Sequence, residues 1–296
     1  MDKQFFLLWT ISAKDIGLTI KEFLKEREIS KAALTDIKFG GGGIFVNGKE
    51  VNVRYVLGED DTLKVVFPLE IPSEGMRKEN IPLNIVFEDE YLLVVNKPPF
   101  MNTIPSREHP TGSLANAILG YYERIGLIAA PHIVTRLDRN TSGLVLIAKH
   151  RHVHHLLSKQ QKNGLVDRMY VALVHGQLGE DSGTVKEPIG RKLDSIIERE
   201  VTVNGQYACT HYQILQRYNE ICYIQLKLET GRTHQIRVHM SYLGHPIVGD
   251  DLYGGEIELI NRQALHCRKL SFFHPFNKKI LSFEVPVASD MENIMK

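Results

Sequence analysis

The segment from Ile133 to Leu144 is the part of the chain whose residue types best suit catalysis. Its sequence is IVTRLDRNTSGL, in which Arg136 and Arg139 lie on either side of Asp138. A carboxylate between two guanidinium groups stays ionised, because neighbouring positive charge favours the anion. Such a group can act as a nucleophile or as a general base. The residue types alone also fit a solvated salt bridge in a surface turn, which is the commoner origin of charge clusters.

Four short motifs, spread over about residues 80 to 290, carry a resemblance to a known family. Residues 135–143, TRLDRNTSG, resemble the signature HRLDxxTSG of the RluA/RluD-type pseudouridine synthases. The other motifs are NKP at 96–98, ETGRTHQIRVH at 229–239, and GHPIVGD at 244–250 followed by YG at 253–254. They occur in the family's order. Thr135 stands where the family often has histidine, and that histidine is not the family's nucleophile.

The resemblance implies a catalytic role for three residues. Asp138 aligns with the family's catalytic aspartate, and Arg237 aligns with the arginine that pairs with it. Tyr170 aligns with the tyrosine that stacks on the target uracil and accepts its proton from carbon 5; without the resemblance, a core position in a strand would be favoured. Arg136 aligns with an arginine that helps to displace the base. The residues expected to bind RNA or to support the site are Arg136, Arg139, Arg232, His234 and Lys97.

The chemistry of pseudouridine formation explains why these residue types occur together. The reaction breaks a carbon–nitrogen glycosidic bond, turns the uracil and forms a carbon–carbon bond. An aromatic ring can hold the detached base by stacking, and an arginine can keep the carboxylate ionised and oriented. The reaction is redox-neutral and needs no cofactor, so we expect turnover to survive chelation of metals. The sequence leaves open whether Asp138 attacks the sugar, attacks the base or acts as a general base.

The histidines and cysteines of the chain do not have the spacing of a metal site. The histidines His150, His152, His154 and His155 would lie on several faces of one helix, and no carboxylate or cysteine completes a ligand set with them. We therefore predict no metal site. The cysteines Cys209, Cys222 and Cys267 are far apart and lack metal-type spacing. Such sparse cysteines are typical of a reducing compartment, and we expect a cytoplasmic protein.

Local rather than overall charge points to a nucleic-acid partner. The formal net charge is only +1, so electrostatic binding must depend on clustering. Residues 136–168, named the basic segment below, suit a phosphate backbone, with a solvated helix face as the alternative. We expect RNA as the partner, no membrane contact and a monomer. The basic residues of this segment are Arg136, Arg139, Lys149, Arg151, Lys159, Lys162 and Arg168, and its acidic residues are Asp138 and Asp167.

The hydrophobic patterns predict the fold that must position these residues. With 43% hydrophobic and 24% charged residues, the composition is that of a globular protein. The length of 296 residues favours two domains. Strands outnumber helices over residues 83–290 without regular alternation, which predicts an α+β fold with a mixed, largely antiparallel sheet. Its predicted helices cover 113–125, 152–161 and 235–243, and its predicted strands cover 85–87, 92–95, 144–148, 170–174, 208–216, 222–228 and 281–285.

A small unit is predicted over residues 10–68, followed by a proline-containing linker at 69–82. It resembles the RNA-binding domain named after ribosomal protein S four. The residues that carry this resemblance are 20–24, Ser30-Lys31, Ile37, the glycines 40–43, Val46-Asn47-Gly48 and 58–61. The elements predicted for the unit are helices near 20–24 and 30–37, a hairpin of strands 44–46 and 51–53 turning at Asn47-Gly48, and a strand at 63–67. Its charges are mixed, so a role in packing alone is the alternative to RNA binding. The apolar run at 5–9 is too short for a membrane span.

Two other classes of protein are alternatives to an RNA pseudouridine synthase. A non-catalytic RNA-binding or ribosome-assembly factor on the same fold would not need the set Asp138, Tyr170 and Arg237. A glycoside hydrolase generally needs two cooperating carboxylates, and the motifs offer one. We therefore expect isomerisation of uridine in structured RNA. The resemblance favours large-subunit ribosomal RNA as the substrate, with transfer RNA as the alternative.

Overall fold

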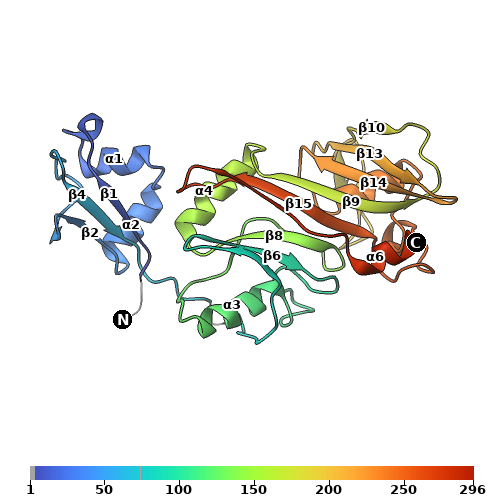
Figure 1. Ribbon diagram of the computed structural model, residues 1–296, viewed down its shortest axis with the longest axis horizontal. Helices are drawn as coiled ribbons and strands as arrows, with labels where there is room; N and C mark the ends of the chain where they lie inside the picture. The colour runs from blue at the N-terminus through green and yellow to red at the C-terminus, as the bar shows by residue number, and fades with distance from the viewer. Residues whose placement is uncertain (1–3, 74) are drawn as a thin grey trace.

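The computed structural model describes residues 4–73 and 75–296, which form a small N-terminal unit and a large unit (Figure 1). Each unit has its own hydrophobic core. The described residues between β4 (Thr62–Val66) and β5 (Ile85–Glu88) form neither helix nor strand. Within the described part of the chain, every helix is too short or too polar to cross a lipid bilayer.

The N-terminal unit is a four-stranded sheet of order β1-β4-β2-β3, packed against two helices. Both helices begin where expected, because the hydroxyls of Thr19 and Ser30 accept hydrogen bonds from the amides of Glu22 and Ala33. The predicted start at residue 10 was wrong, since β1 is the apolar run and pairs with β4. The remaining elements are β1 (Phe6–Thr10), α1 (Ile20–Glu26), α2 (Lys31–Phe39), β2 (Gly43–Val46) and β3 (Lys49–Glu50).

The predicted hairpin forms, but its second strand comes earlier than expected. Asn47 and Gly48 both have positive φ, 51° and 79°, as a two-residue hairpin turn of type I′ requires. Strand β3 therefore begins directly after the turn and pairs with β2, with Val46 opposite Lys49. The predicted return strand at 51–53 was wrong for this reason.

The large unit contains a ten-stranded sheet, in agreement with the predicted α+β class. Its main path runs β10-β13-β14-β9-β15-β8-β6-β5, with β16 beside β15 and β7 beside β8. All pairs are antiparallel except β8 with β15, so the sheet is mixed and largely antiparallel. Its further strands are β6 (Leu92–Lys97), β7 (His132–Ile133), β8 (Ser142–Ala148), β9 (Asp167–His175), β10 (Ser182–Val185), β13 (Thr210–Arg217), β14 (Ile221–Leu228), β15 (Leu265–Phe273) and β16 (Ile280–Glu284).

Four helices and a small two-stranded ladder complete the large unit. The side chains of Leu114, Ile118 and Tyr122 on α3 belong to the main core, as do Val153 and Leu157 on α4. The predicted end at residue 290 falls inside α6, whose Met291 is fully buried in that core. The elements are α3 (Leu114–Arg124), α4 (Arg151–Lys162), α5 (Gln235–Tyr242), α6 (Ser289–Ile294), β11 (Ile189–Arg191) and β12 (Arg199–Val201).

The two units touch through aromatic rings and ion pairs near the start of α4. The ring of Phe5 stacks on His150 with centroids 4.0 Å apart, and Phe67 stacks on His152 at 5.5 Å. Burial lowers the pKa of each of these histidines to about 4, so both rings are neutral near pH 7. The surrounding ion pairs join Asp36 to Arg151 and Glu28 to Lys159.

Candidate active site

Hydrogen bonds from the neighbouring Thr103 hold the loop that carries Asp138, residues 134–141. The hydroxyl of Thr103 donates to the Leu137 carbonyl at 2.6 Å and accepts from the Leu137 amide at 3.2 Å. Gly143 follows the loop in β8 with φ +114°, and a Cβ there would lie 2.3 Å from the Cys267 carbonyl oxygen of β15. Glycine is therefore required for the two parallel strands to approach, and this contact sets where the loop leaves the sheet.

Lys97 also fixes this loop and does not face the solvent. Its side chain is fully buried, and its ammonium group donates to the carbonyl oxygens of Pro98 at 2.9 Å, Met101 at 2.8 Å and Arg139 at 3.2 Å. Burial lowers the pKa of Lys97 to about 7. The predicted contact between Lys97 and RNA was wrong, because a residue enclosed in this way cannot reach a phosphate.

Asp138, Arg237 and Asp250 form a line of charges across the site. Arg237 donates from Nε and Nη2 to both carboxylate oxygens of Asp250 at 2.7 Å. Its remaining Nη1 donates to Oδ2 of Asp138 at 3.3 Å. The Asp250 side chain is fully buried, whereas that of Asp138 is 32% exposed. The structure thus brings Asp138 and Arg237 together as expected, and it adds Asp250 as the residue that orients the guanidinium.

His234 lies on the other side of Asp138, with Nε2 3.8 Å from Oδ2. Its backbone is left-handed, with φ 57°, at the residue that precedes α5. The Tyr253 hydroxyl accepts from the Arg199 amide at 2.9 Å and lies 2.8 Å from Nδ1 of His234. We assign the hydroxyl proton to Nδ1, which leaves the Nε2 proton facing Asp138. Burial lowers the pKa of His234 despite the nearby Asp138, so the ring is neutral near pH 7.

Tyr170 forms part of the wall of the site, on β9. Its side chain is 4% exposed, and burial raises the pKa of its phenol, so it is protonated at neutral pH. The neighbouring Arg168 donates from Nη1 to this hydroxyl at 3.1 Å. Both residues project into one cavity with Asp138. Sequence reasoning placed Arg168 in the basic segment and missed that it holds Tyr170, although the spacing of two in a strand puts both on one face.

These residues surround an open cavity of about 720 Å³. Asp138 and Tyr170 line it, and Asp138 is the one carboxylate among the described residues that do so. Arg136 and Arg139 are exposed beside Asp138, and Arg232 is exposed across the cavity. An anion bordered by arginines, next to an aromatic ring, can react with a planar base held in a polyanionic chain.

The structure divides the basic segment into two parts. Arg136, Arg139 and Arg168 line the cavity. Lys149, in contrast, is buried and donates to Glu88 at 2.5 Å. Arg151 and Lys159 form the ion pairs with the N-terminal unit, so only part of the segment forms a basic surface at the site.

Comparison with known proteins adds an independent observation. A family model described as RNA pseudouridylate synthase matches residues 91–242, which include Asp138, Tyr170 and Arg237. An uncharacterized RNA pseudouridine synthase of Bacillus subtilis, YjbO, is 54% identical over 94% of this chain and 99% of its own length. This chain belongs to the RNA pseudouridine synthase family. The synthase is thus an enzyme that isomerises uridine in RNA.

Other similar proteins agree with this assignment. The ribosomal large subunit pseudouridine synthase D of Vibrio parahaemolyticus is 34% identical over 98% of the synthase and 94% of its own length. Among solved structures, human RNA pseudouridylate synthase domain containing 1 superposes with a TM-score of 0.59 and 26% identity. That match covers 70% of the synthase and 84% of the human chain.

Proposed function

We propose that Asp138 is the catalytic carboxylate of this pseudouridine synthase. The observation that carries the proposal is that no other carboxylate among the described residues lines the cavity, while Asp138 contacts Arg237 there. A single anion suits a reaction in which one carboxylate attacks the substrate or removes a proton. It does not suit a glycoside hydrolase, which generally needs two carboxylates facing the substrate.

The other residues of the cavity can hold the base, orient Asp138 and contact the RNA backbone. Tyr170 offers a buried aromatic wall against which the detached uracil can stack while it turns. Arg237, oriented by Asp250, holds the Asp138 carboxylate in a fixed direction through a charge-assisted hydrogen bond. Arg136 and Arg139 are exposed beside Asp138, so they can hold flanking phosphates or fill the space left by a displaced base.

We further propose that the substrate is a uridine in a loop or junction of large-subunit ribosomal RNA. Several relatives named ribosomal large subunit pseudouridine synthase D are 33–34% identical over 90–100% of this chain, which supports that choice of RNA. The loop preference has a physical reason. The major groove of an RNA helix is too deep and narrow to read, whereas splayed loop bases are accessible. A loop uridine also loses less stacking when it is flipped out.

Mapping of pseudouridine in RNA from cells that lack the gene tests both proposals. The purified protein should introduce pseudouridine into ribosomal RNA, and Asp138→Asn should introduce none while its affinity for RNA changes little. The matched control is Asp167→Asn, since Asp167 is an exposed carboxylate outside the cavity. Appreciable turnover by Asp138→Asn would refute the catalytic assignment. Modification confined to transfer RNA would refute the ribosomal one.

A pair of short RNAs tests the loop preference separately. The target sequence is presented once as a hairpin loop and once within a perfect duplex. The loop form should react faster, and its binding should weaken steeply as salt rises, because phosphate contacts release counterions. Equal rates on both RNAs would contradict the preference.

A further inference from the structure

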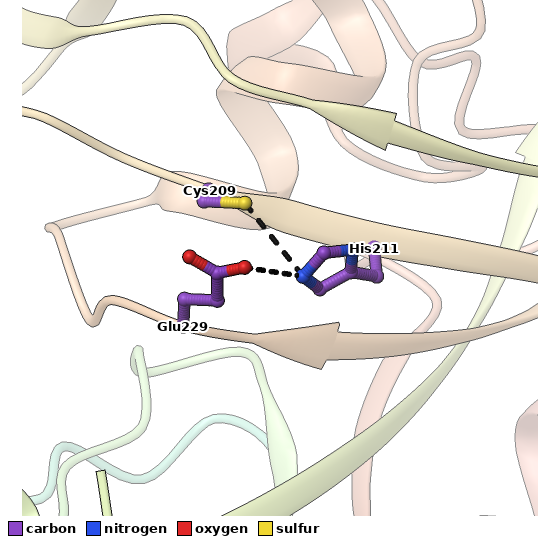
Figure 2. A group of neighbouring side chains, drawn as sticks. All are labelled: Cys209, His211 and Glu229. Carbon is purple, nitrogen blue, oxygen red and sulfur yellow. Dashed lines mark hydrogen bonds and ion pairs between the residues drawn. The ribbon is translucent and has the colours of Figure 1, made fainter.

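Three side chains with metal-binding groups converge at one end of the β13–β14 pair (Figure 2). Cys209 immediately precedes β13, His211 lies within it, and Glu229 immediately follows β14. Cys209 and His211 are two residues apart in extended chain, so their side chains share a face. Glu229 joins them from the neighbouring strand, where its amide donates to the Cys209 carbonyl at 3.2 Å.

All three ligand atoms lie within 4.8 Å of one another, and two of their separations can be compared with those of a zinc site. The Cys209 Sγ lies 3.7 Å from Nε2 of His211, and that nitrogen lies 2.8 Å from Oε1 of Glu229. Tetrahedral zinc with ordinary bond lengths holds sulfur and nitrogen about 3.6 Å apart, and nitrogen and oxygen about 3.4 Å apart. The sulfur and nitrogen therefore already have the required spacing, and the carboxylate needs to move by about half an ångström.

The hydroxyl groups of two neighbouring residues lie within hydrogen-bond distance of His211 and Glu229. In known metal sites, groups in such positions orient the ligand side chains. The Nδ1 atom of His211 lies 2.9 Å from the Thr184 hydroxyl oxygen. In the metal-free protein Nε2 donates to Glu229, and zinc binding would replace the Nε2 proton while Nδ1 keeps its proton beside Thr184. The Tyr207 hydroxyl donates to the other oxygen of Glu229 at 3.1 Å. Hydrogen bonds of this kind fix the tautomer of a ligand histidine and the direction of a ligand carboxylate.

We propose that Cys209, His211 and Glu229 bind one zinc ion, with water as the fourth ligand. The combination of thiolate and imidazole selects zinc over magnesium or calcium, which prefer oxygen ligands. Binding displaces the thiol proton of Cys209 into solvent, so affinity rises with pH. The exposed fractions of His211 and Glu229 side chains, 39% and 47%, give the ion a path to the site.

The zinc site is separate from the catalytic cavity but adjoins a segment that serves it. None of its three ligands lines the cavity. The carbonyl of Cys209 accepts from the Gln235 side chain at 2.9 Å, and the Gln235 side chain in turn accepts from the Arg232 amide at 3.0 Å. A bound ion would therefore stabilise the segment 229–235, which presents Arg232 and His234, without taking part in the reaction.

Titration of the metal-free full-length protein with zinc, in competition with a chromophoric chelator, tests the proposal. The wild type should bind one equivalent, and cobalt should give a tetrahedral spectrum with a thiolate charge-transfer band. Cys209→Ser should lose at least about tenfold in affinity and also lose that band, and Thr184→Val should lose roughly tenfold. Cys222→Ser is the matched control, since Cys222 is equally buried in the main core. It should bind as the wild type does.

Several results would overturn the proposal. They are a wild type that binds no stoichiometric zinc, a Cys209→Ser variant that binds as tightly as the wild type, and a cobalt spectrum without a thiolate band. If Cys209→Ser does not fold, Glu229→Gln provides the same comparison, because its exposed side chain tolerates substitution and only the anionic ligand is lost.

Discussion

At the scale of single residues, the direction of the Arg237 guanidinium depends on a carboxylate that does not face the substrate. Two of its donor groups bind Asp250, which leaves Nη1 to point at Asp138. A planar guanidinium held at two points cannot rotate, so the position of the third donor is fixed. Asp250 is thus a positioning residue, and its place in the motif GHPIVGD has a physical reason.

Substitution of Asp250 should be much more damaging than substitution of its neighbour. Asp250→Ala leaves the buried Arg237 without its main partner, which should lower the free energy of unfolding by about 3–5 kcal/mol and lower kcat. Asp251→Ala is the control, because Asp251 is exposed. Chemical denaturation and single-turnover kinetics provide the measurements. Equal stability of the two variants would contradict the positioning role.

Lys97 should matter for stability and not for binding of RNA. Lys97→Met keeps most of the side-chain volume and leaves the carbonyls of Pro98, Met101 and Arg139 without their donor. We expect a loss of about 1–3 kcal/mol in the free energy of unfolding, with RNA affinity near that of the wild type. Arg139→Ala should show the opposite pattern, because Arg139 is exposed at the cavity. A large drop in RNA affinity for folded Lys97→Met would contradict this expectation and would support a contact between Lys97 and RNA.

The sequence motifs identified which residues belong to the site more reliably than what each one does. Asp138, Tyr170, His234 and Arg237 were all predicted from the motifs, and the structure gathers them around one cavity. Lys97 was predicted to contact RNA from the same kind of evidence and is enclosed instead. A motif records residue type and order, whereas the direction of a side chain depends on strands that pair from distant parts of the chain.

At the scale of secondary structure, the close approach of β8 and β15 depends on one glycine. Gly143→Ala would place a Cβ 2.3 Å from a backbone oxygen of β15, so the strands must separate. Gly126→Ala is a matched control, since Gly126 also has positive φ, +67°, but has no atom within 4 Å of a new Cβ. The control should lose about 1–2 kcal/mol in the free energy of unfolding, the cost of a left-handed backbone for a residue with a Cβ, and Gly143→Ala should lose several times more. Equal losses in thermal or chemical unfolding would contradict this reading of the strand pair.

The strand β15 was missing from the sequence-based prediction for a structural reason. Its register shifts between Cys267 and Lys269, where it pairs with β9. This bulge interrupts the alternation of buried and exposed residues that marks a strand. By contrast, β8 is buried along its whole length and was predicted well, because continuous apolar runs indicate a central strand. The pairing order of the sheet could not be predicted from local patterns at all.

At the scale of the whole molecule, the N-terminal unit has its own core and contacts the synthase core through ring stacks and ion pairs near the start of α4. Deletion of residues 1–75 should leave a folded and active core that binds large RNA less tightly. The cut falls in the segment between β4 and β5, so no strand is lost from the large sheet. Circular dichroism, turnover on a short RNA and affinity for a large RNA are the measurements. An insoluble core would show that the two units form one cooperative structure.

Acid should loosen the contact between the units. His150 and His152 have a pKa of about 4 when packed against Phe5 and Phe67, compared with the ordinary value of 6.5. Between these pH values the separated state binds more protons, so the stability of the contact is complete above pH 6.5 and falls as the pH is lowered toward 4. Each histidine contributes up to about 1.4 kcal/mol per pH unit.

A comparison of variants measures this contribution. His152→Phe removes one titrating ring and keeps an aromatic one, so its unfolding free energy should depend less on pH between 4 and 6.5 than that of the wild type. His109→Phe is the matched control, because it makes the same substitution at an exposed position. An identical pH dependence in the wild type and His152→Phe would show that this histidine does not titrate on separation of the units.

The parallel pairing of β8 with β15 also has a consequence for the order in which the chain folds. The shape of the Asp138 loop depends on two contacts with distant parts of the chain. Arg262 donates to the Asn140 carbonyl across 122 residues, and β15 pairs with β8 at Gly143. Arg262 is itself held by Asp290 of the last helix. On a ribosome the chain emerges from its N-terminus, and contacts of such sequence separation form late. The Asp138 loop therefore takes its final shape only after Arg262 and Asp290 have been synthesised, and we expect a nascent chain that lacks them to be inactive toward RNA.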